Sequence, residues 1–307
     1  MTSPVSIRDM VPHDNTRPKI SVIIPALNEA RNLPHVADRI PADIDEIVFV
    51  DGGSQDDTVE VAKRLWPEAV HLRQSRKGKG NALNCGFAAA TGDVIVMIDA
   101  DGSTDPAEIP RFVGALMAGA DFAKGSRFIQ GGGSDDITRI RRAGNWGLNA
   151  LVNVLFGTRY TDLCYGYNAF WRHCLGAFNL PDIGTTEPQW GDGFEIETLI
   201  NVRVAAHGLS ITEVHSHEAV RIHGASNLNA VRDGLRVLRT IRSEFFALRA
   251  AARRTAARRT AAAQAASDTT ALADVIPPST LRRLRLRRRG IDPQDISLDR
   301  VPGEQAL

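Results

Sequence analysis

The sequence has few cysteines and no long apolar run. Three cysteines occur among 307 residues, far apart and with no C-x-x-C pair, so a disulfide framework is excluded and a reducing compartment is favoured. No apolar run reaches the roughly 18–20 residues that a membrane-spanning helix needs. The first eighteen residues are polar and hold no apolar signal segment. We therefore expect a cytoplasmic protein.

The sequence also lacks the glycine patterns of common phosphate-binding loops. No glycine lies in residues 25–29, directly after the first predicted strand, which argues against the G-x-G-x-x-G loop of a nicotinamide-dependent dehydrogenase. Residues 76–80 are basic and glycine-rich, but they lack the G-x-x-x-x-G-K-S/T spacing of a P-loop. Two interpretations of this segment remain: a flexible loop that binds phosphate, or a solvated turn.

The charge is unevenly distributed although the net charge is only +1. Residues 231–290 hold fifteen arginines and four acidic residues, a net charge of +11, which leaves the rest of the chain near −10. A basic segment of this kind is suited to phosphate, nucleic acid or an anionic membrane surface. The hydrophobic share of 43% is ample for a packed core.

Apolar strand patterns alternate with helical patterns from Lys19 onward. The β-branched run at 20–24 is typical of a buried parallel strand. Further extended segments are predicted at 46–50, 69–72, 93–98, 121–126, 163–170 and 210–214. Helices are predicted at 28–39, 54–65, 79–90, 106–117, 139–156 and 193–206. This alternation predicts an α/β fold with a mostly parallel sheet and helices on both faces.

The predicted α/β domain covers residues 19–228, after a loose N-terminal arm at 1–18. In residues 229–250, apolar side chains recur every three or four positions with arginines between them, which predicts a basic amphipathic helix. Residues 251–307 are expected to form a linker and a basic disordered tail. The helix either packs on the domain, contacts the inner face of an anionic membrane peripherally, or binds nucleic acid. We expect no nucleic-acid partner, because the helix has no aromatic interleaving.

Acidic side chains follow three of the predicted strands. Glu29 follows the first strand, Asp51 follows the second, and Asp99 and Asp101 follow the strand at 93–98. Ligands of open parallel sheets bind at the carboxyl ends of strands. The carboxylates at 99 and 101 can reach one cation, and hard oxygen ligands select Mg²⁺ or Mn²⁺. A D-x-D motif alone is more often a turn, but its place after a buried strand favours a metal site that would neutralise a diphosphate leaving group.

Several segments, in their order and spacing, resemble glycosyltransferase family 2, and within it the dolichol- and polyprenyl-phosphate mannosyl- and glucosyltransferases. The matching segments are residues 21–33, 46–58, 78–103, 124–128, 161–170, 193–198 and 221–228. The resemblance covers roughly residues 19–245. It implies a single GT-A domain and a metal-dependent, inverting transfer of a hexose. Mannose or glucose would pass from GDP-mannose or UDP-glucose to polyprenyl or dolichyl phosphate.

The resemblance also implies roles for individual residues at the donor site. The implied donor-binding set is Pro25, Leu27, Glu29, Val50, Asp51, Gly52, Asp99, Ala100, Asp101, Ser103, Arg127, Arg221 and Asn227. Leu27 stands where the family usually has tyrosine, Gly52 where it often has a second aspartate, and Asn227 where it often has lysine. Metal ligation falls to Asp99 and Asp101.

The implied acceptor is a phosphate held by Arg139 and Arg142. A phosphate monoester is mostly dianionic at pH 7, since its second pKa is about 6, so it needs cations rather than a general base. A hydroxyl of a soluble or glycan acceptor would need a base, for which Asp192 and Glu195 are the candidates. The predicted catalytic residues are Asp101, Arg127 and Asp192. A non-catalytic binding protein on the same fold is a further alternative.

Overall fold

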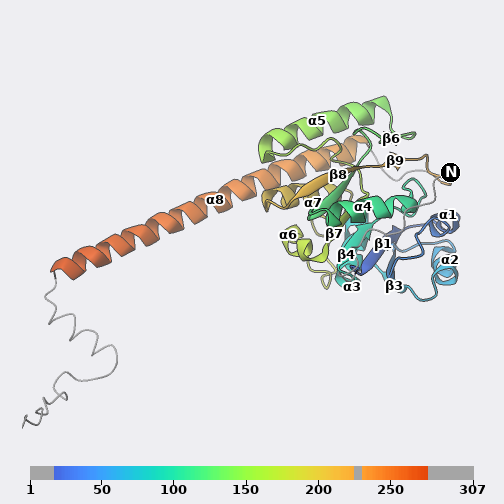
Figure 1. The fold of residues 1–307 in the computed structure, drawn as a ribbon, viewed down its shortest axis with the longest axis horizontal. Helices are drawn as coiled ribbons and strands as arrows, with labels where there is room; N and C mark the ends of the chain where they lie inside the picture. Colours follow the sequence, from blue (N-terminus) through green and yellow to red (C-terminus); the bar gives the residue numbers. More distant parts are fainter. Residues whose placement is uncertain (1–16, 225–229, 276–307) are drawn as a thin grey trace, which may run out of the picture. The chain divides into compact units, whose positions relative to one another are not determined.

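The computed structural model describes residues 17–224 and 230–275 (Figure 1). The chain divides into two units, residues 1–247 and residues 248–307. The first unit is built on a seven-stranded sheet with the order β3-β2-β1-β4-β7-β5-β8. Its strands, in that order, are Val70–Arg73, Glu46–Asp51, Ile20–Ala26, Val94–Met97, Asn168–Trp171, Phe122–Ser126 and Ile211–His215.

The sheet is mostly parallel, as predicted. Only β7 runs antiparallel, between β4 and β5, and the other neighbouring strands are parallel. A small second sheet pairs β6 (Gly133–Ser134) with β9 (His217–Glu218). The parallel register brings the carboxyl ends of β1, β2 and β4 to one edge, which fixes the place of the site.

Helices cover both faces of the sheet because the strand side chains alternate between two cores. Val22 and Ile24 of β1 enter one core, whereas Ile23 enters the other. The first core also receives α1 (Leu33–Ala37), α2 (Thr58–Leu65) and α4 (Ile109–Met117). The second receives α3 (Lys79–Ala89), α6 (Leu175–Phe178) and α7 (Ile196–Ala206). Short 3₁₀ turns, η2 (Pro106–Glu108) and η3 (Arg172–Cys174), precede α4 and α6.

A third apolar cluster joins α5 (Arg139–Phe156), α7 and the first turns of α8 (Ala230–Val275). Val237 and Ile241 of α8 are buried there beside Val152 of α5. Arg203 of α7 also pairs with Glu244 of α8 at 2.8 Å. The predicted basic helix therefore packs part of its apolar stripe on the domain. No helix among the described residues is long and apolar enough to cross a membrane.

Three of the predicted elements differ most in length from the structure. The helix α8 continues to Val275 through residues 251–275, which were predicted to be a linker, because alanine is the best helix former and no glycine or proline interrupts this stretch. The strand predicted at 163–170 is shorter, since the carbonyl of Tyr165 accepts from the Lys124 ammonium instead of a strand. The helix predicted at 28–39 shrinks to α1, because Asn28 adopts a left-handed conformation with φ of 58°.

Candidate active site

A cavity of about 420 Å³ lies at the carboxyl ends of β1, β2 and β4. Ten residues of the predicted donor set line it: Pro25, Leu27, Glu29, Gly52, Asp99, Ala100, Asp101, Ser103, Arg127 and Arg221. Val50 is fully buried in the core. The Asp51 carboxylate accepts from the backbone N–H of Gly53 and Ser54, so it shapes the loop. Asn227 lies outside the described residues.

The two carboxylates of the D-x-D motif take different partners. Asp101 Oδ1 accepts from the backbone N–H and hydroxyl of Ser103, whereas Asp101 Oδ2 lies 3.4 Å from Arg221. Asp99 Oδ1 lies 2.6 Å from Lys79 Nζ. No group of three or more His, Cys, Asp or Glu in the described residues could hold a metal ion. The two aspartates fit Mg²⁺ or Mn²⁺ nonetheless, because such ions commonly bind one or two carboxylates together with substrate phosphates and water.

Lys79 at the start of α3 bridges two carboxylates inside the cavity. Its ammonium lies 2.6 Å from Asp99 and 2.7 Å from Glu197 of α7. Burial lowers the pKa of Lys79, but these two carboxylates outweigh it and leave the pKa above its ordinary value. Burial also raises the pKa of Glu197, a shift that Lys79 opposes and Asp99 reinforces. The site thus holds a fixed cation beside the predicted metal ligand.

Arg221 reaches the cavity from the segment after β9. Its guanidinium donates to both carboxylate oxygens of Glu29 at 2.9 to 3.0 Å. Its Nε is buried and has no hydrogen-bond partner. Burial raises the pKa of Glu29, although hydrogen bonds from Asn32 and the charge of Arg221 oppose the shift. The contact of Arg221 with the D-x-D motif runs through Nη2, which lies 3.4 Å from Asp101 Oδ2.

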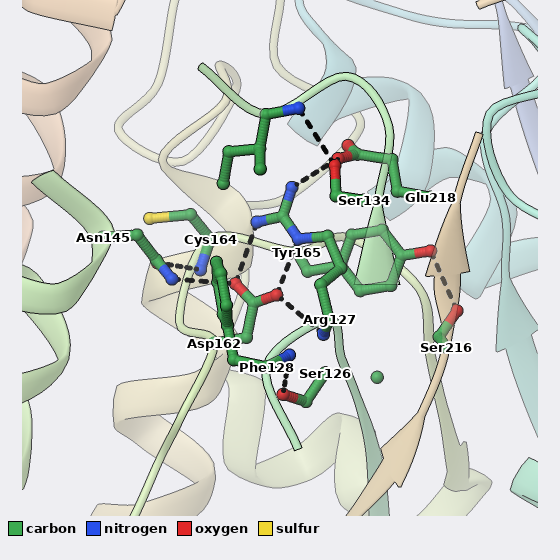
Figure 2. Close-up of polar contacts among 12 residues, drawn as sticks. Ser126, Arg127, Phe128, Ser134, Asn145, Asp162, Cys164, Tyr165, Ser216 and Glu218 are labelled. Carbon is green, nitrogen blue, oxygen red and sulfur yellow. Dashed lines mark hydrogen bonds and ion pairs between the residues drawn. The ribbon is translucent and has the colours of Figure 1, made fainter. Parts of the chain in front are cut away.

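Arg127 also lines the cavity, but carboxylates of the fold surround it (Figure 2). Its Nε and Nη2 donate to Asp162 at 2.7 and 2.9 Å, and its Nη1 donates to Glu218 at 2.9 Å. Asp162 is fully buried and also accepts from Asn145 of α5. The Tyr165 ring stacks 4.7 Å from the guanidinium carbon of Arg127. We call Arg127, Asp162 and Glu218 the buried arginine cluster.

The residues predicted as general bases, Asp192 and Glu195, do not line the cavity. Asp192 forms a two-point ion pair with Arg76 at 2.8 and 2.9 Å. Glu195 is 1% exposed and accepts from the backbone of Gly191 and Gly193. Both carboxylates therefore order the loop before α7. The same loop packs closely on residues 76–80. A Cβ on Gly78 would lie 2.0 Å from the Asp192 carbonyl oxygen, so this close packing explains why that segment is rich in glycine.

The predicted acceptor arginines lie beside a second hollow. Arg139 and Arg142 line it together with Ile137, Ala143 and Trp146. Arg141, between them in sequence, points instead into the main cavity with Asp136, whose carboxylate lies 2.8 Å from the Arg141 guanidinium. Successive helical positions differ by about 100°, so the three arginines of one turn cannot share a face. The role predicted for Arg139 and Arg142 stays a prediction.

Three functional candidates were missed from the sequence: Lys79, Glu197 and Arg141. Each lay in or beside a segment already singled out, since Lys79 falls in residues 78–103, Glu197 in 193–198, and Arg141 between two chosen arginines. Helical phase could have separated Arg141 from its neighbours. The pairing of Lys79 with Glu197 spans 118 residues of sequence, and no local pattern reveals it.

Comparisons with known proteins agree with this geometry. The family model described as Glycosyl transferase family 2 matches residues 21–176. The crystal structure of glucosyl-3-phosphoglycerate synthase from Mycobacterium tuberculosis in complex with Mn²⁺ and UDP-glucose superposes with a TM-score of 0.60 and 26% identity, and the match covers 80% of this chain and 84% of that one. Fold and cavity thus define a glycosyltransferase of the GT-A class.

Curated relatives place the chain more closely. Polyprenol monophosphomannose synthase of Mycolicibacterium smegmatis is 34% identical over 218 residues, which are 68% of this chain and 80% of the relative. Undecaprenyl-phosphate mannosyltransferase of Micrococcus luteus is 31% identical over 205 residues, or 64% of this chain and 82% of the relative. The chain belongs to glycosyltransferase family 2, as the sequence motifs predicted.

Proposed function

We propose that this glycosyltransferase moves a hexose, mannose or glucose, from a nucleotide diphosphate sugar to polyprenyl phosphate. One observation carries the proposal. Asp99, Asp101 and Arg221 face the same cavity that Arg141 enters from α5. The cavity therefore offers carboxylates for a metal-bound diphosphate and a separate cation for a second phosphate. Relatives named as polyprenyl-phosphate mannosyltransferases support this acceptor.

The donor diphosphate would lie between the D-x-D motif and Arg221. Arg221 would leave its partial contact with Asp101 to donate to phosphate oxygens, while Glu29 keeps its guanidinium in place. A bound Mg²⁺ or Mn²⁺ would neutralise charge that develops on the diphosphate. Glu197 and Lys79, which line the same cavity, would then contact the sugar end of the donor.

The acceptor phosphate would attack without a general base. One oxygen of the dianionic phosphate forms the new bond to the anomeric carbon, and the bond from that carbon to the diphosphate oxygen breaks with its electron pair. Attack opposite the leaving group inverts the configuration. Arg141 would hold the incoming phosphate by charge-assisted hydrogen bonds. The products are polyprenyl phosphosugar and a nucleoside diphosphate.

A soluble hydroxyl acceptor is the second candidate function. Glu197 favours it, because this carboxyl lines the cavity and burial raises its pKa, and a hydroxyl nucleophile needs a base. The similar solved structure is a glucosyl-3-phosphoglycerate synthase, which also supports a soluble acceptor. Glu197 replaces Asp192 and Glu195 as the base to test, since those two do not line the cavity.

The test is transfer of label from a panel of nucleotide sugars, with Mg²⁺ or Mn²⁺ and polyprenyl phosphate, into the organic phase. We expect transfer of label to the lipid to depend on the metal. The Asp101→Asn variant should transfer label about a thousandfold more slowly, since charge stabilisation by a metal is worth several kcal/mol. Asparagine keeps the acceptor for Ser103, so the variant should fold normally. Two results together would favour the second function: nucleoside diphosphate is released only when a soluble acceptor is added, and the Glu197→Gln variant no longer releases it.

A further inference from the structure

The cavity reaches beyond the D-x-D motif to the carboxyl ends of β2 and β3. Gly52 directly follows β2 and Gln74 directly follows β3, and both line the cavity together with Leu27. In the strand order β3-β2-β1-β4, these two positions and the D-x-D motif lie on opposite sides of β1. A nucleotide whose diphosphate lies at Asp99 and Asp101 would therefore direct its nucleoside toward Gly52 and Gln74.

The polar groups at the end of β2 are occupied by the fold itself. The backbone N–H of Gly52 donates to the Ala26 carbonyl at 2.7 Å. The two oxygens of the Asp51 carboxylate accept from the backbone N–H groups of Gly53 and Ser54 at 3.1 and 3.0 Å. Asp51 also does not line the cavity. The carboxylate that follows β2 therefore holds a turn and is not placed to contact a nucleobase.

Leu27 closes the space beside Gly52. A Cβ on Gly52 would lie 3.1 Å from Leu27 Cβ, 3.4 Å from Leu27 Cδ1 and 3.1 Å from the Ala26 carbonyl oxygen. A side chain at position 52 would therefore press on Leu27 and on the backbone of β1. Two departures from the family pattern, leucine at position 27 and glycine at position 52, are thus linked by packing, and no acidic side chain can replace Gly52 without moving Leu27.

The amide of Gln74 is fixed with its acceptor unused. Its Nε2 donates to the Gly52 carbonyl at 3.0 Å, and because a carbonyl can only accept, this contact decides which end of the amide is nitrogen. Its Oε1 accepts no hydrogen bond from any residue in 17–224 and 230–275. The backbone N–H of Gln74 donates to the Asp51 carbonyl at 3.0 Å, which anchors the residue at the end of β3.

We infer that Gln74 is the residue that holds the nucleobase of the donor. Its Oε1 accepts from a ring N–H of the base, and the second hydrogen of Nε2 donates to the base oxygen beside it. Uracil offers this pair as N3–H and O4, and guanine offers it as N1–H and O6. The inference rests on the proposed function, because it requires a nucleotide donor. Gln74 determines the affinity for the base, whereas the D-x-D motif binds the diphosphate.

Calorimetric titration in Mn²⁺ tests the contact with three probes. These are UDP, GDP and methyl β-ribofuranoside 5-diphosphate, which keeps the sugar and the diphosphate but has no base. Gln74→Leu should weaken binding of the tighter nucleotide about tenfold and leave the base-free probe unchanged. The matched control is Gln189→Leu, because Gln189 is exposed, lies outside the cavity and also donates from Nε2 to a backbone carbonyl, that of Glu187.

Gln74→Glu adds a readout that a purely structural role would not change. The carboxylate has the same length and accepts at both oxygens. It can accept from N1–H and the amino group of guanine together, but it repels O4 beside N3–H of uracil. The ratio of the UDP dissociation constant to the GDP dissociation constant should therefore rise about tenfold relative to the wild type.

The outcomes separate this inference from the proposed function. If Gln74→Leu binds all three probes as the wild type does, or weakens all three equally, the base contact is overturned and the proposed function stands. An unchanged ratio in Gln74→Glu would also overturn the base contact. If the wild type binds none of the three probes, the proposed function fails, and the inference fails with it.

Discussion

Arg127 and Arg221 line the same cavity, yet their surroundings differ. Arg127 is 5% exposed and satisfied by Asp162 and Glu218. Arg221 has one carboxylate partner, Glu29, a long contact to Asp101 and a buried Nε without a partner. Both belong to the donor-binding set that the resemblance implied. The buried arginine cluster is therefore part of the wall of the cavity, and we propose that the edge formed by Asp99, Asp101 and Arg221 meets the ligand.

The largest expected effect is a difference in the free energy of unfolding between variants of Arg127 and of Arg221. Arg127→Met should reduce the free energy of unfolding by about 3–5 kcal/mol, because it leaves the buried Asp162 without its cation. Arg221→Met should cost only about 1–2 kcal/mol, since Glu29 keeps its hydrogen bond from Asn32 and burial already raises its pKa toward the neutral form. Chemical denaturation of both variants measures the difference. Equal losses of stability in the two variants would mean that Arg127 and Arg221 have the same structural role, which would contradict the distinction drawn here.

A smaller effect is expected at the acceptor side. Arg141→Gln should raise the KM for polyprenyl phosphate about tenfold, since hydrogen bonds to charged groups contribute roughly 1.5–3 kcal/mol. The KM for the nucleotide sugar should stay unchanged. Arg111→Gln is a suitable control, because Arg111 pairs with Glu108 outside the cavity. A donor KM that rises instead would move Arg141 to the diphosphate.

The smallest effect concerns pH and the wall of the cavity. Lys124 is fully buried and donates to the carbonyls of Gly125 and Tyr165. Burial lowers its pKa below 10.5, so between the lowered value and 10.5 the unfolded chain binds more protons than the folded one. Stability from this group is therefore complete above pH 10.5 and is lost as pH falls through the folded pKa.

Lys124→Met removes this titration while keeping the side-chain length. The stability lost on substitution should grow as pH rises through the alkaline range, as denaturation at several pH values would measure. A loss that is constant with pH would mean that Lys124 keeps an ordinary pKa. At neutral pH, below this titration, the two carbonyls left without a donor should make the loss about 1–3 kcal/mol.

The edge of the cavity could be predicted from sequence, and its wall could not. The β-branched run at 20–24 and the D-x-D motif after 93–98 are local patterns, so β1, β4 and the place of Asp99 and Asp101 follow from strand order. The resemblance placed Arg127 in the donor-binding set, and the partners that Arg127 has in the structure are distant in sequence. Asp162 lies 35 residues away and Glu218 lies 91 residues away, and sequence alone does not say whether an arginine faces a substrate or its own fold.

The acceptor side shows the same limit at short range. The resemblance implied phosphate binding by Arg139 and Arg142 at the start of α5, but only the helical phase places Arg141 at the cavity. The bases Asp192 and Glu195 were chosen near a helix start, where acidic side chains also hold backbone N–H groups. In the structure Glu195 holds such groups and Asp192 pairs with Arg76, which leaves Glu197 to face the cavity.

Calorimetric titration of the nucleoside diphosphate tests the central claim most directly. The wild type and Asp101→Asn would be titrated in Mn²⁺ and again in a chelator. If the edge holds the metal and the diphosphate, the wild type binds far more tightly in Mn²⁺ than in chelator, and Asp101→Asn loses that difference. Binding by Asp101→Asn that is as tight and as metal-dependent as the wild type would contradict the account.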